Sequence, residues 1–270
     1  MDRGDAGTKG EGSTVRAVDR AIAILQCFTA DKPALSVLEI QRRVGLSRPT
    51  LYRLLQTLAA TGLVKAEGDP QRFRLSHGVM ELAHVWLAGL DKVDVARPVL
   101  ESLREATGET AALFVLREQK RICVVELESH HALTIARGVG DTGDITLGAS
   151  GKAILAYLDE KRRDAILDKV SSKARRAELI KALDVVRNRG FATSHGEVIV
   201  GAIALAAPTF NHNGEVAGCV GMFGPQARVK DSDIPRFGAL VMHAANAISL
   251  QSGYRAGPDA RAKPAKSRRV

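Results

Sequence analysis

The stretch from Gly45 to Leu75, GLSRPTLYRLLQTLAATGLVKAEGDPQRFRL, constrains the fold of this chain more than any other. Ser47 is a favourable N-cap, and Pro49 falls in the first helical turn, where its missing N–H has no bond to lose. The helical pattern runs to Gly62, a residue type that commonly ends helices. Beyond it, the apolar residues follow the period of strands around a Gly-Asp-Pro turn at residues 68–70. The stretch therefore predicts a helix followed at once by a β-hairpin.

Two shorter helices are predicted ahead of this one. In SVLEIQRRVG, Ser36 and Glu39 have the spacing of a capping box and Gly45 ends the helix. The segment VRAVDRAIAILQCF places an apolar stripe on a first helix, which we expect to be buried: Val15, Val18, Ala21, Ile22, Leu25 and Phe28. Three helices joined by tight turns and followed by a hairpin predict a winged helix-turn-helix domain over residues 15–76.

The third predicted helix has an apolar side and a polar side. Its apolar side, which must face the other two helices, carries Leu51, Leu54, Leu55 and Leu58. The opposite side and the basic hairpin carry side chains that suit base edges and phosphates in a duplex. The predicted DNA-contacting residues are Ser47, Arg48, Pro49, Thr50, Tyr52, Arg53, Gln56, Lys65, Arg72 and Arg74. The alternative is that these residues form the solvated faces of a small helical domain.

The charge of the chain is concentrated at its two ends. The net charge is +9, with 12 Lys/Arg against 9 Asp/Glu in residues 1–90 and 6 against 1 in residues 251–270. Such ends favour a polyanionic partner for the N-terminal part. Residues 1–14 and the basic tail, residues 253–270, are expected to be disordered, and the tail could equally be a solubilising end without a partner.

The remaining composition excludes several classes of protein. No apolar run approaches the roughly 20 residues needed to span a bilayer and the start lacks an export signal, so we expect a cytoplasmic protein that binds no membrane. Cys27, Cys123 and Cys219 are scattered, which predicts free thiols. The histidines lack the partners of a zinc site, so neither metal nor cofactor is expected.

Residues 77–92 are predicted to form a linker helix. Its apolar residues cover more than one face: Val79, Leu82, Ala83, Trp86, Leu87 and Leu90. We expect this helix to pack against its symmetry mate in a homodimer whose recognition helices meet half-sites about one helical turn apart, or a multiple of that. The alternative is that these residues belong to the core of the same chain.

Residues 93–252 are predicted to form an α+β domain. Hairpins are expected at residues 110–129 and 202–225, and further strands at ALTIARG, residues 132–138, and ITLGAS, residues 145–150. Helices are expected at residues 95–108, 151–158, 173–190 and 231–251.

The chain resembles the IclR family of bacterial transcriptional regulators from Val15 to about Leu250. The resemblance rests on SVLEIQRRVGLSRPTLYRLLQTLAATGLV, LGASGKAILAYL and RNRGFATSHGEVIVGAIALAAPTFNHNGEVAGCVGMFGP, in that order. It implies an N-terminal winged helix that binds double-stranded operator DNA, a linker helix and a C-terminal GAF-like domain that binds a small effector. It also implies dimers or dimers of dimers, and control of a catabolic operon by a small organic acid.

The segment GASGKA offers an anion site. Small residues precede a helix expected to begin near Lys152, and free N–H groups at such an end attract carboxylates or phosphates. A nucleotide P-loop is excluded, because Thr146 and Ala153 stand where it needs Gly and Ser or Thr. The alternative is a Gly-rich turn that only permits close packing.

The segment AGCVGMFGP has the alternation of a strand, with Cys219, Gly221 and Phe223 on one face. The resemblance places this face in the effector pocket and Glu197 in the pocket loop. Family members that bind small keto acids have hydroxyl side chains where Gly221 and Phe223 stand, so we expect a carboxylate ligand with an apolar or aromatic body. The predicted effector-binding residues are Ala149, Ser150, Gly151, Glu197, Cys219, Gly221 and Phe223. Phe223 could instead be plain core.

Catalysis is not expected from this sequence. Ser194 and His195 are sequence neighbours, which seldom form a nucleophile and base, and no G-x-S-x-G elbow is present. Two other functions remain as alternatives. One is a small-molecule hydrolase with an accessory DNA-binding domain, and the other is a non-specific nucleoid-type DNA-binding protein.

Overall fold

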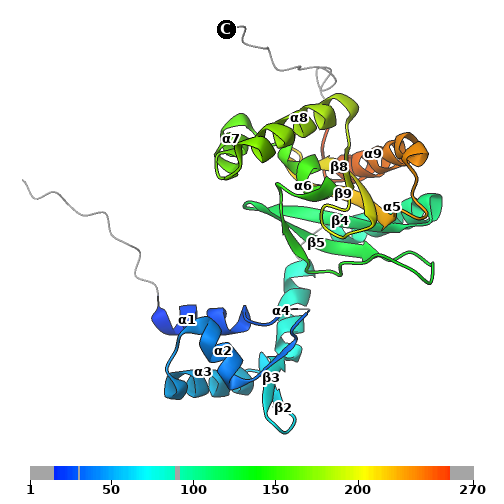
Figure 1. Ribbon diagram of the computed structural model, residues 1–270. Helices are drawn as coiled ribbons and strands as arrows, with labels where there is room; N and C mark the ends of the chain where they lie inside the picture. The colour runs from blue at the N-terminus through cyan, green and yellow to red at the C-terminus, as the bar shows by residue number, and fades with distance from the viewer. Residues whose placement is uncertain (1–14, 30, 89–91, 256–270) are drawn as a thin grey trace, which may run out of the picture. The chain divides into compact units, whose positions relative to one another are not determined.

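The computed structural model describes residues 15–29, 31–88 and 92–255. The chain divides into two compact units, residues 1–89 and 90–270, which are coloured blue to cyan and cyan to red in Figure 1. The expected disorder of residues 1–14 and of most of the tail lies outside the described residues, as does Leu90 of the predicted linker.

The N-terminal unit consists of a helical cluster, a small sheet and a final helix. Its helices are α1 (Arg16–Leu25), α2 (Val37–Val44), α3 (Arg48–Ala60) and α4 (His77–Ala88), and its strands are β1 (Ala34–Leu35), β2 (Val64–Glu67) and β3 (Arg72–Leu75). The sheet is antiparallel with the order β1-β3-β2. The short strand β1 was not predicted from the sequence.

Local sequence rules explain the start and end of α2. The Ser36 hydroxyl accepts a hydrogen bond from the Glu39 backbone N–H at 3.3 Å, and the Glu39 carboxylate accepts one from the Ser36 N–H at 2.8 Å. This is the predicted capping box. Gly45 ends the helix in the left-handed region with φ 66°, where a side chain would be strained.

The predicted stripe of α1 is wrong in part. Val15, Val18 and Ile22 are exposed, whereas Ile24 and Phe28 lie in the core of this unit. Val18 and Ile22, one turn apart, lie on a side of α1 that faces solvent, and Phe28 lies beyond the end of the helix at Leu25. The core contacts come from the last turn of α1 and the segment after it.

The C-terminal unit is built on a six-stranded antiparallel sheet with the order β6-β5-β4-β9-β8-β7. Its strands are β4 (Thr110–Arg117), β5 (Lys120–Leu127), β6 (Thr142–Asp144), β7 (Ala192–His195), β8 (Ala202–Phe210) and β9 (Val216–Pro225). Its helices are α5 (Lys92–Thr107), α6 (Gly148–Leu155), α7 (Glu160–Leu167), α8 (Lys173–Arg189) and α9 (Ile234–Gln251), the last preceded by the 3-10 turn η1 (Asp231–Asp233).

The central strand β4 is buried on both sides. Ala112, Phe114 and Leu116 belong to the core that also contains residues of α6 and α8. Strand alternation turns Leu113 and Val115 to the opposite face. Helix α5 packs against β4 and β5, and against α9, which in turn packs against β8 and β9.

Two predicted strands of this unit are absent from the structure. Residues 132–138 are irregular, because side chains satisfy their backbone: the Thr110 hydroxyl donates to the Ile135 carbonyl at 2.7 Å, and the Glu126 carboxylate accepts from the Arg137 N–H at 3.1 Å. Residues 145–150 are no strand either, since β6 lies just before them and α6 already begins at Gly148. Strand β7 and helix α7 were not predicted.

Candidate functional site

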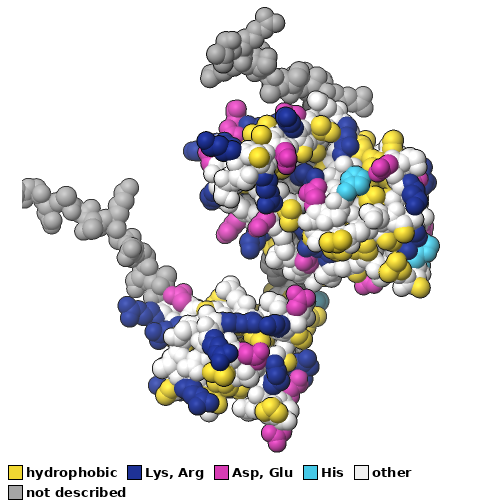
Figure 2. Space-filling view, in the orientation of Figure 1, with side chains coloured by type: hydrophobic (Ala, Val, Ile, Leu, Met, Phe, Trp, Pro, Cys, Tyr) yellow, Lys and Arg dark blue, Asp and Glu magenta, His cyan; other side chains and the backbone are white. Residues whose placement is uncertain are grey.

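The polar side of α3 is open to solvent within its unit. Leu51, Leu55 and Leu58 are buried against the other helices. The opposite side chains, Pro49, Tyr52, Arg53 and Gln56, are exposed. Figure 2 shows Lys and Arg side chains spread over this unit. The division into a buried and an open side is the one that the helical wheel predicts.

The start of α3 is held by the turn before it. Ser47 occupies the N-cap position with extended backbone, but its hydroxyl pairs with that of Thr50 at 2.9 Å and caps no backbone N–H. Gln41 donates from its side-chain amide to the Leu46 carbonyl at 3.1 Å, which ties α2 to the turn. Arg48 is exposed at the first position of the helix.

The basic residues of the hairpin, which we call the wing, already have acidic neighbours. Arg72 donates to the Ala34 carbonyl at 3.1 Å and to Glu39 at 3.2 Å. Lys65 and Arg74 share Glu67, at 3.2 and 3.1 Å. Exposed ion pairs of this kind contribute only about 0–1 kcal/mol, so a phosphate can replace the carboxylate at little cost.

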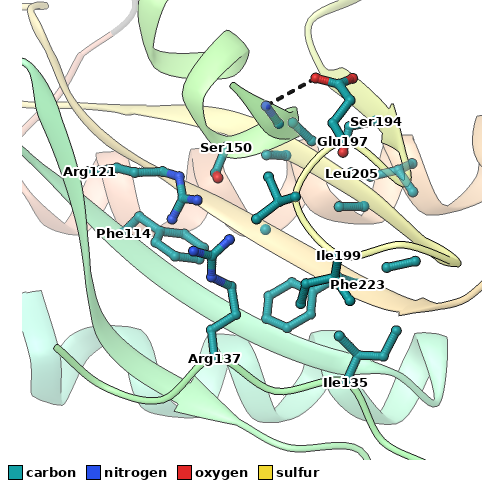
Figure 3. A pocket seen from close by; sticks show the side chains of 17 residues that line it. Phe114, Arg121, Ile135, Arg137, Ser150, Ser194, Glu197, Ile199, Leu205 and Phe223 are labelled. Atoms are coloured by element: carbon teal, nitrogen blue, oxygen red, sulfur yellow. Dashed lines mark hydrogen bonds between the residues drawn. The ribbon is translucent and has the colours of Figure 1, made fainter. Parts of the chain in front are cut away.

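A cavity opens in the C-terminal unit between the sheet, the start of α6 and the loop after β7. It holds about 480 Å³ of atom-free space, part of it open to solvent. Of the predicted effector-binding residues, it is lined by Ala149, Ser150, Glu197, Gly221 and Phe223. Figure 3 shows Ser150, Glu197 and Phe223 around it. Elements distant in the sequence therefore meet at one place.

The helix end that was expected to hold an acid is occupied by a side chain of the protein. Glu197 accepts a hydrogen bond from the Gly148 N–H at 3.1 Å and an ion pair from the Lys152 ammonium at 2.5 Å. The carboxylate thus takes the place of a bound anion at the N-terminus of α6. The helix begins at Gly148 and not near Lys152, which corrects the expected start. Of the backbone N–H groups at this end, Glu197 accepts from that of Gly148.

Two predicted lining residues lie outside the cavity. A Cβ atom at Gly151 would be 2.9 Å from the carbonyls of Asp144 and Ile145, so this glycine serves close packing. Cys219 is on the predicted face of β9, but α6 covers it, and its thiol donates to the Ser150 carbonyl at 3.5 Å. Burial raises the pKa of this thiol to about 12.

Sequence reasoning missed the cations of the cavity. Arg121 of β5 and Arg137 of the irregular segment both line it, and Figure 3 shows their guanidinium groups pointing toward each other. They share Asp141, at 3.4 Å from Arg121 and 2.6 Å from Arg137. One feature of the sequence indicated that Arg121 points inward: it lies two residues before the apolar Cys123, on the same face of the strand. In the structure Arg121 pairs with Leu116, and Cys123 pairs with Phe114.

The residues considered for catalysis do not form a nucleophile and base. Ser194 is buried on the side of β7 that lines the cavity, whereas His195 is exposed and its ring lies 3.1 Å from Asp231. Adjacent strand residues point to opposite faces, so the imidazole cannot reach the Ser194 hydroxyl in this conformation.

Within residues 15–29, 31–88 and 92–255, no helix has the length and apolarity needed to cross a membrane. Among the same residues, no three His, Cys, Asp or Glu side chains are grouped so that they could hold a metal ion.

Comparison with known proteins covers both units. Residues 17–68 match the IclR helix-turn-helix domain, and residues 84–250 match the C-terminal domain of bacterial transcriptional regulators of the IclR type. The chain is 30% identical over 257 residues to the HTH-type transcriptional regulator BhcR of Paracoccus denitrificans, and the match covers 92% of each protein.

Solved structures give the same result for the fold. An IclR transcriptional regulator from Alicyclobacillus acidocaldarius matches with a TM-score of 0.78 at 26% identity, covering 89% of this chain and 100% of that one. An IclR homologue from Microbacterium hydrocarbonoxydans in complex with 4-hydroxybenzoate matches with a TM-score of 0.72 at 21% identity, covering 87% of this chain and 98% of that one.

Proposed function

Because this chain belongs to the IclR family of bacterial transcriptional regulators, we propose that it binds a specific operator through α3 and responds to a small organic acid. The acid binds in the cavity of the C-terminal unit and changes the affinity for the operator, which controls a catabolic operon. The chain acts on DNA in the cytoplasm and catalyses no reaction.

The exposed polar side of α3 is the observation that carries the DNA-binding proposal. Tyr52, Arg53 and Gln56 lie opposite a buried row of leucines, so they can enter a major groove without disturbing the core. Lys65, Arg72 and Arg74 of the wing extend the contact to phosphates.

Footprinting on the DNA upstream of the chain's own gene, followed by titration of the protected site, tests this proposal. Arg53→Ala should relax the preference for that site by about 1–3 kcal/mol per base pair read. Arg72→Ala should weaken binding to all sequences and reduce the salt slope by about 1, because it removes a phosphate contact. Equal binding of wild type to every sequence would instead support the nucleoid-type alternative.

An organic acid is supported as the effector class by the cavity and by one relative. The cavity is lined by aromatic rings and by two guanidinium groups, and the Microbacterium homologue is a complex with an aromatic acid, 4-hydroxybenzoate. Gly221 and Phe223, where hydroxyl side chains were expected for keto-acid binders, leave this wall apolar. We therefore propose a carboxylate with an apolar or aromatic body.

Assembly as a homodimer or a dimer of dimers is part of the proposal. Met80, Leu82 and Val85 of α4 are exposed, as are Val18 and Ile22 of α1, and such apolar surface favours burial against a second copy. The side chains of Trp86 and Leu87, on which the prediction also depended, lie outside those described. Light scattering that reports a monomer would remove this part of the proposal.

The hydrolase alternative receives no support from the site. Ser194 and His195 point to opposite faces of β7, and the relatives compared are regulators. Turnover of a small ester that is lost on Ser194→Ala would revive the alternative.

A further inference from the structure

We infer that the carboxylate of the effector binds between Arg121 and Arg137, on the β5 side of the cavity and away from the start of α6. This inference rests on the proposed function, because it assigns the acid-binding end of the same cavity. The ligand class that follows is a monocarboxylate with a compact apolar or aromatic body.

Arg121 is a buried cation with donors to spare. Its side chain is 2% exposed, its Nε lacks a hydrogen-bond partner among the described residues, and its Nη1 reaches Asp141 only at 3.4 Å. The guanidinium carbon lies 5.0 Å from the centre of the Phe114 ring. A Cβ atom at Gly143 would be 2.6 Å from Nη2, so a glycine there makes room for this group. A buried group that lacks partners is costly, and an added acceptor would remove that cost.

Arg137 supplies the second half of the site. Its side chain is 16% exposed and donates to Asp141 at 2.6 Å, so one carboxylate serves two guanidinium groups. The backbone N–H groups of Arg137 and Gly138 donate to Glu126, which holds the segment in place. Burial, and then repulsion from Arg137, lower the pKa of Arg121. A second carboxylate between the two groups would offset both effects.

The start of α6 is the poorer place for an incoming acid. Glu197 already accepts from the Gly148 N–H and from Lys152 there, and its negative charge would repel another carboxylate. Figure 3 shows Glu197 across the cavity from the two arginines. The charges of the cavity therefore direct an acid group to the arginine side.

Apolar side chains line the space beside the arginines. Phe114, Phe223, Ile135 and Ile199 all face it, and they suit a flat or branched hydrocarbon body. A Cβ atom at Gly221 would be 3.5 Å from the Phe114 ring, within ordinary contact. The walls thus offer apolar contact, and the recognition of charge falls to the arginines.

Calorimetry on the full chain with matched acids and amides tests the inference. The probes are benzoate and benzamide, 4-hydroxybenzoate and 4-hydroxybenzamide, and isovalerate and isovaleramide. At least one acid should bind, and its amide at least about tenfold more weakly, because the amide lacks the charge that the guanidinium groups bind. Arg137→Gln should weaken the binding of that acid about 10- to 100-fold.

Controls separate binding from folding. Arg117→Gln is the matched control, since Arg117 is an exposed arginine at the end of β4 that does not line the cavity, and it should bind the acid like wild type. Arg137→Lys keeps the charge but loses the planar group, so an intermediate loss is expected. Circular dichroism compares the thermal melting of each variant with that of wild type. If Arg137→Gln melts differently, the binding measured for Arg137→Lys decides the result.

Three outcomes would overturn the inference: no acid binds, an amide binds as well as its acid, or Arg137→Gln binds like wild type. The regulator proposal fails separately, when footprinting finds no operator or when a bound acid leaves operator affinity unchanged. Acid binding that requires Arg137 without any effect on DNA would leave the inference standing and remove the proposed function.

Discussion

The two units of this protein use arginine in opposite ways. In the wing, Arg72 and Arg74 have side chains 46% and 38% exposed and lie beside acidic residues of the same surface. In the cavity, Arg121 and Arg137 are 2% and 16% exposed and share a single carboxylate. An exposed, weakly paired cation suits a polyanion that approaches from solvent, whereas a buried, underpaired cation suits a small anion that enters the protein. Burial, more than residue type, separates the two proposed roles.

Thiol reactivity should show the largest difference between the units. Burial raises the pKa of Cys123 and Cys219 of the C-terminal unit to about 12, against an ordinary value of 9.0, and it also raises the pKa of Cys27 of the N-terminal unit. At pH 8 the thiolate fraction of Cys123 and Cys219 should be about a thousandfold lower than that of an unfolded thiol. Labelling with Ellman's reagent, mapped by mass spectrometry, should therefore modify Cys27 first.

The raised pKa values of Cys123 and Cys219 also make the stability of the C-terminal unit depend on pH. Because the folded pKa lies above the unfolded one, the stabilisation is present below pH 9 and is lost as the pH rises from 9 toward 12. The midpoint of unfolding of the C-terminal unit should therefore be lower at pH 10 than at pH 8. If Cys123 or Cys219 of the native protein reacts as fast as Cys27, the predicted difference in thiol reactivity between the units is wrong.

A pair of core substitutions tests whether the units are independent. Leu51→Ala in α3 and Leu113→Ala in β4 each remove a side chain that is about 1% exposed or less, and each should cost about 2–5 kcal/mol of unfolding free energy. Leu51→Ala should abolish DNA binding and leave Cys123 protected from labelling, whereas Leu113→Ala should speed the labelling of Cys123. If Leu51→Ala also exposes Cys123, the two units unfold together and the comparison loses its basis.

The smallest effect is expected in the wing. Glu67→Gln removes the acid that Lys65 and Arg74 share, and the free energy of unfolding should change by less than about 0.5 kcal/mol. Affinity for DNA should rise slightly and its dependence on salt should steepen, because two cations become free to meet phosphates. Fluorescence anisotropy over a range of salt measures this, with Glu81→Gln on α4 as the matched control. A loss of affinity would show that Glu67 positions the wing.

Sequence rules predicted the DNA-binding unit better than the cavity. Helix α3 and the wing are predicted by a helix cap, by turn residues and by the spacing of apolar residues. All of these features lie within a stretch of about thirty residues. The exposed Val15 and Val18 were misassigned because a helical wheel groups apolar residues but does not show which side of α1 faces the rest of the unit.

The cavity depends on pairing between distant strands. Arg121 and Arg137 meet only because residues 132–138 fold back on β5, through hydrogen bonds to side chains that no periodicity reveals. Likewise, nothing near Gly148 in the sequence shows that Glu197, 49 residues later, fills the helix end. Alternation predicted that Gly221 and Phe223 share one face of β9, the family resemblance placed that face at the pocket, and both residues line the cavity.

The two faces of β4 have a mechanical consequence. Phe114 borders the cavity, while its neighbours Leu113 and Val115 point to the side on which α5 lies, and α5 is the first helix after residues 89–91. Only the thickness of one strand lies between the cavity and α5. In an interior of low compressibility, a shift of that strand by a fraction of an ångström would be passed on and not absorbed.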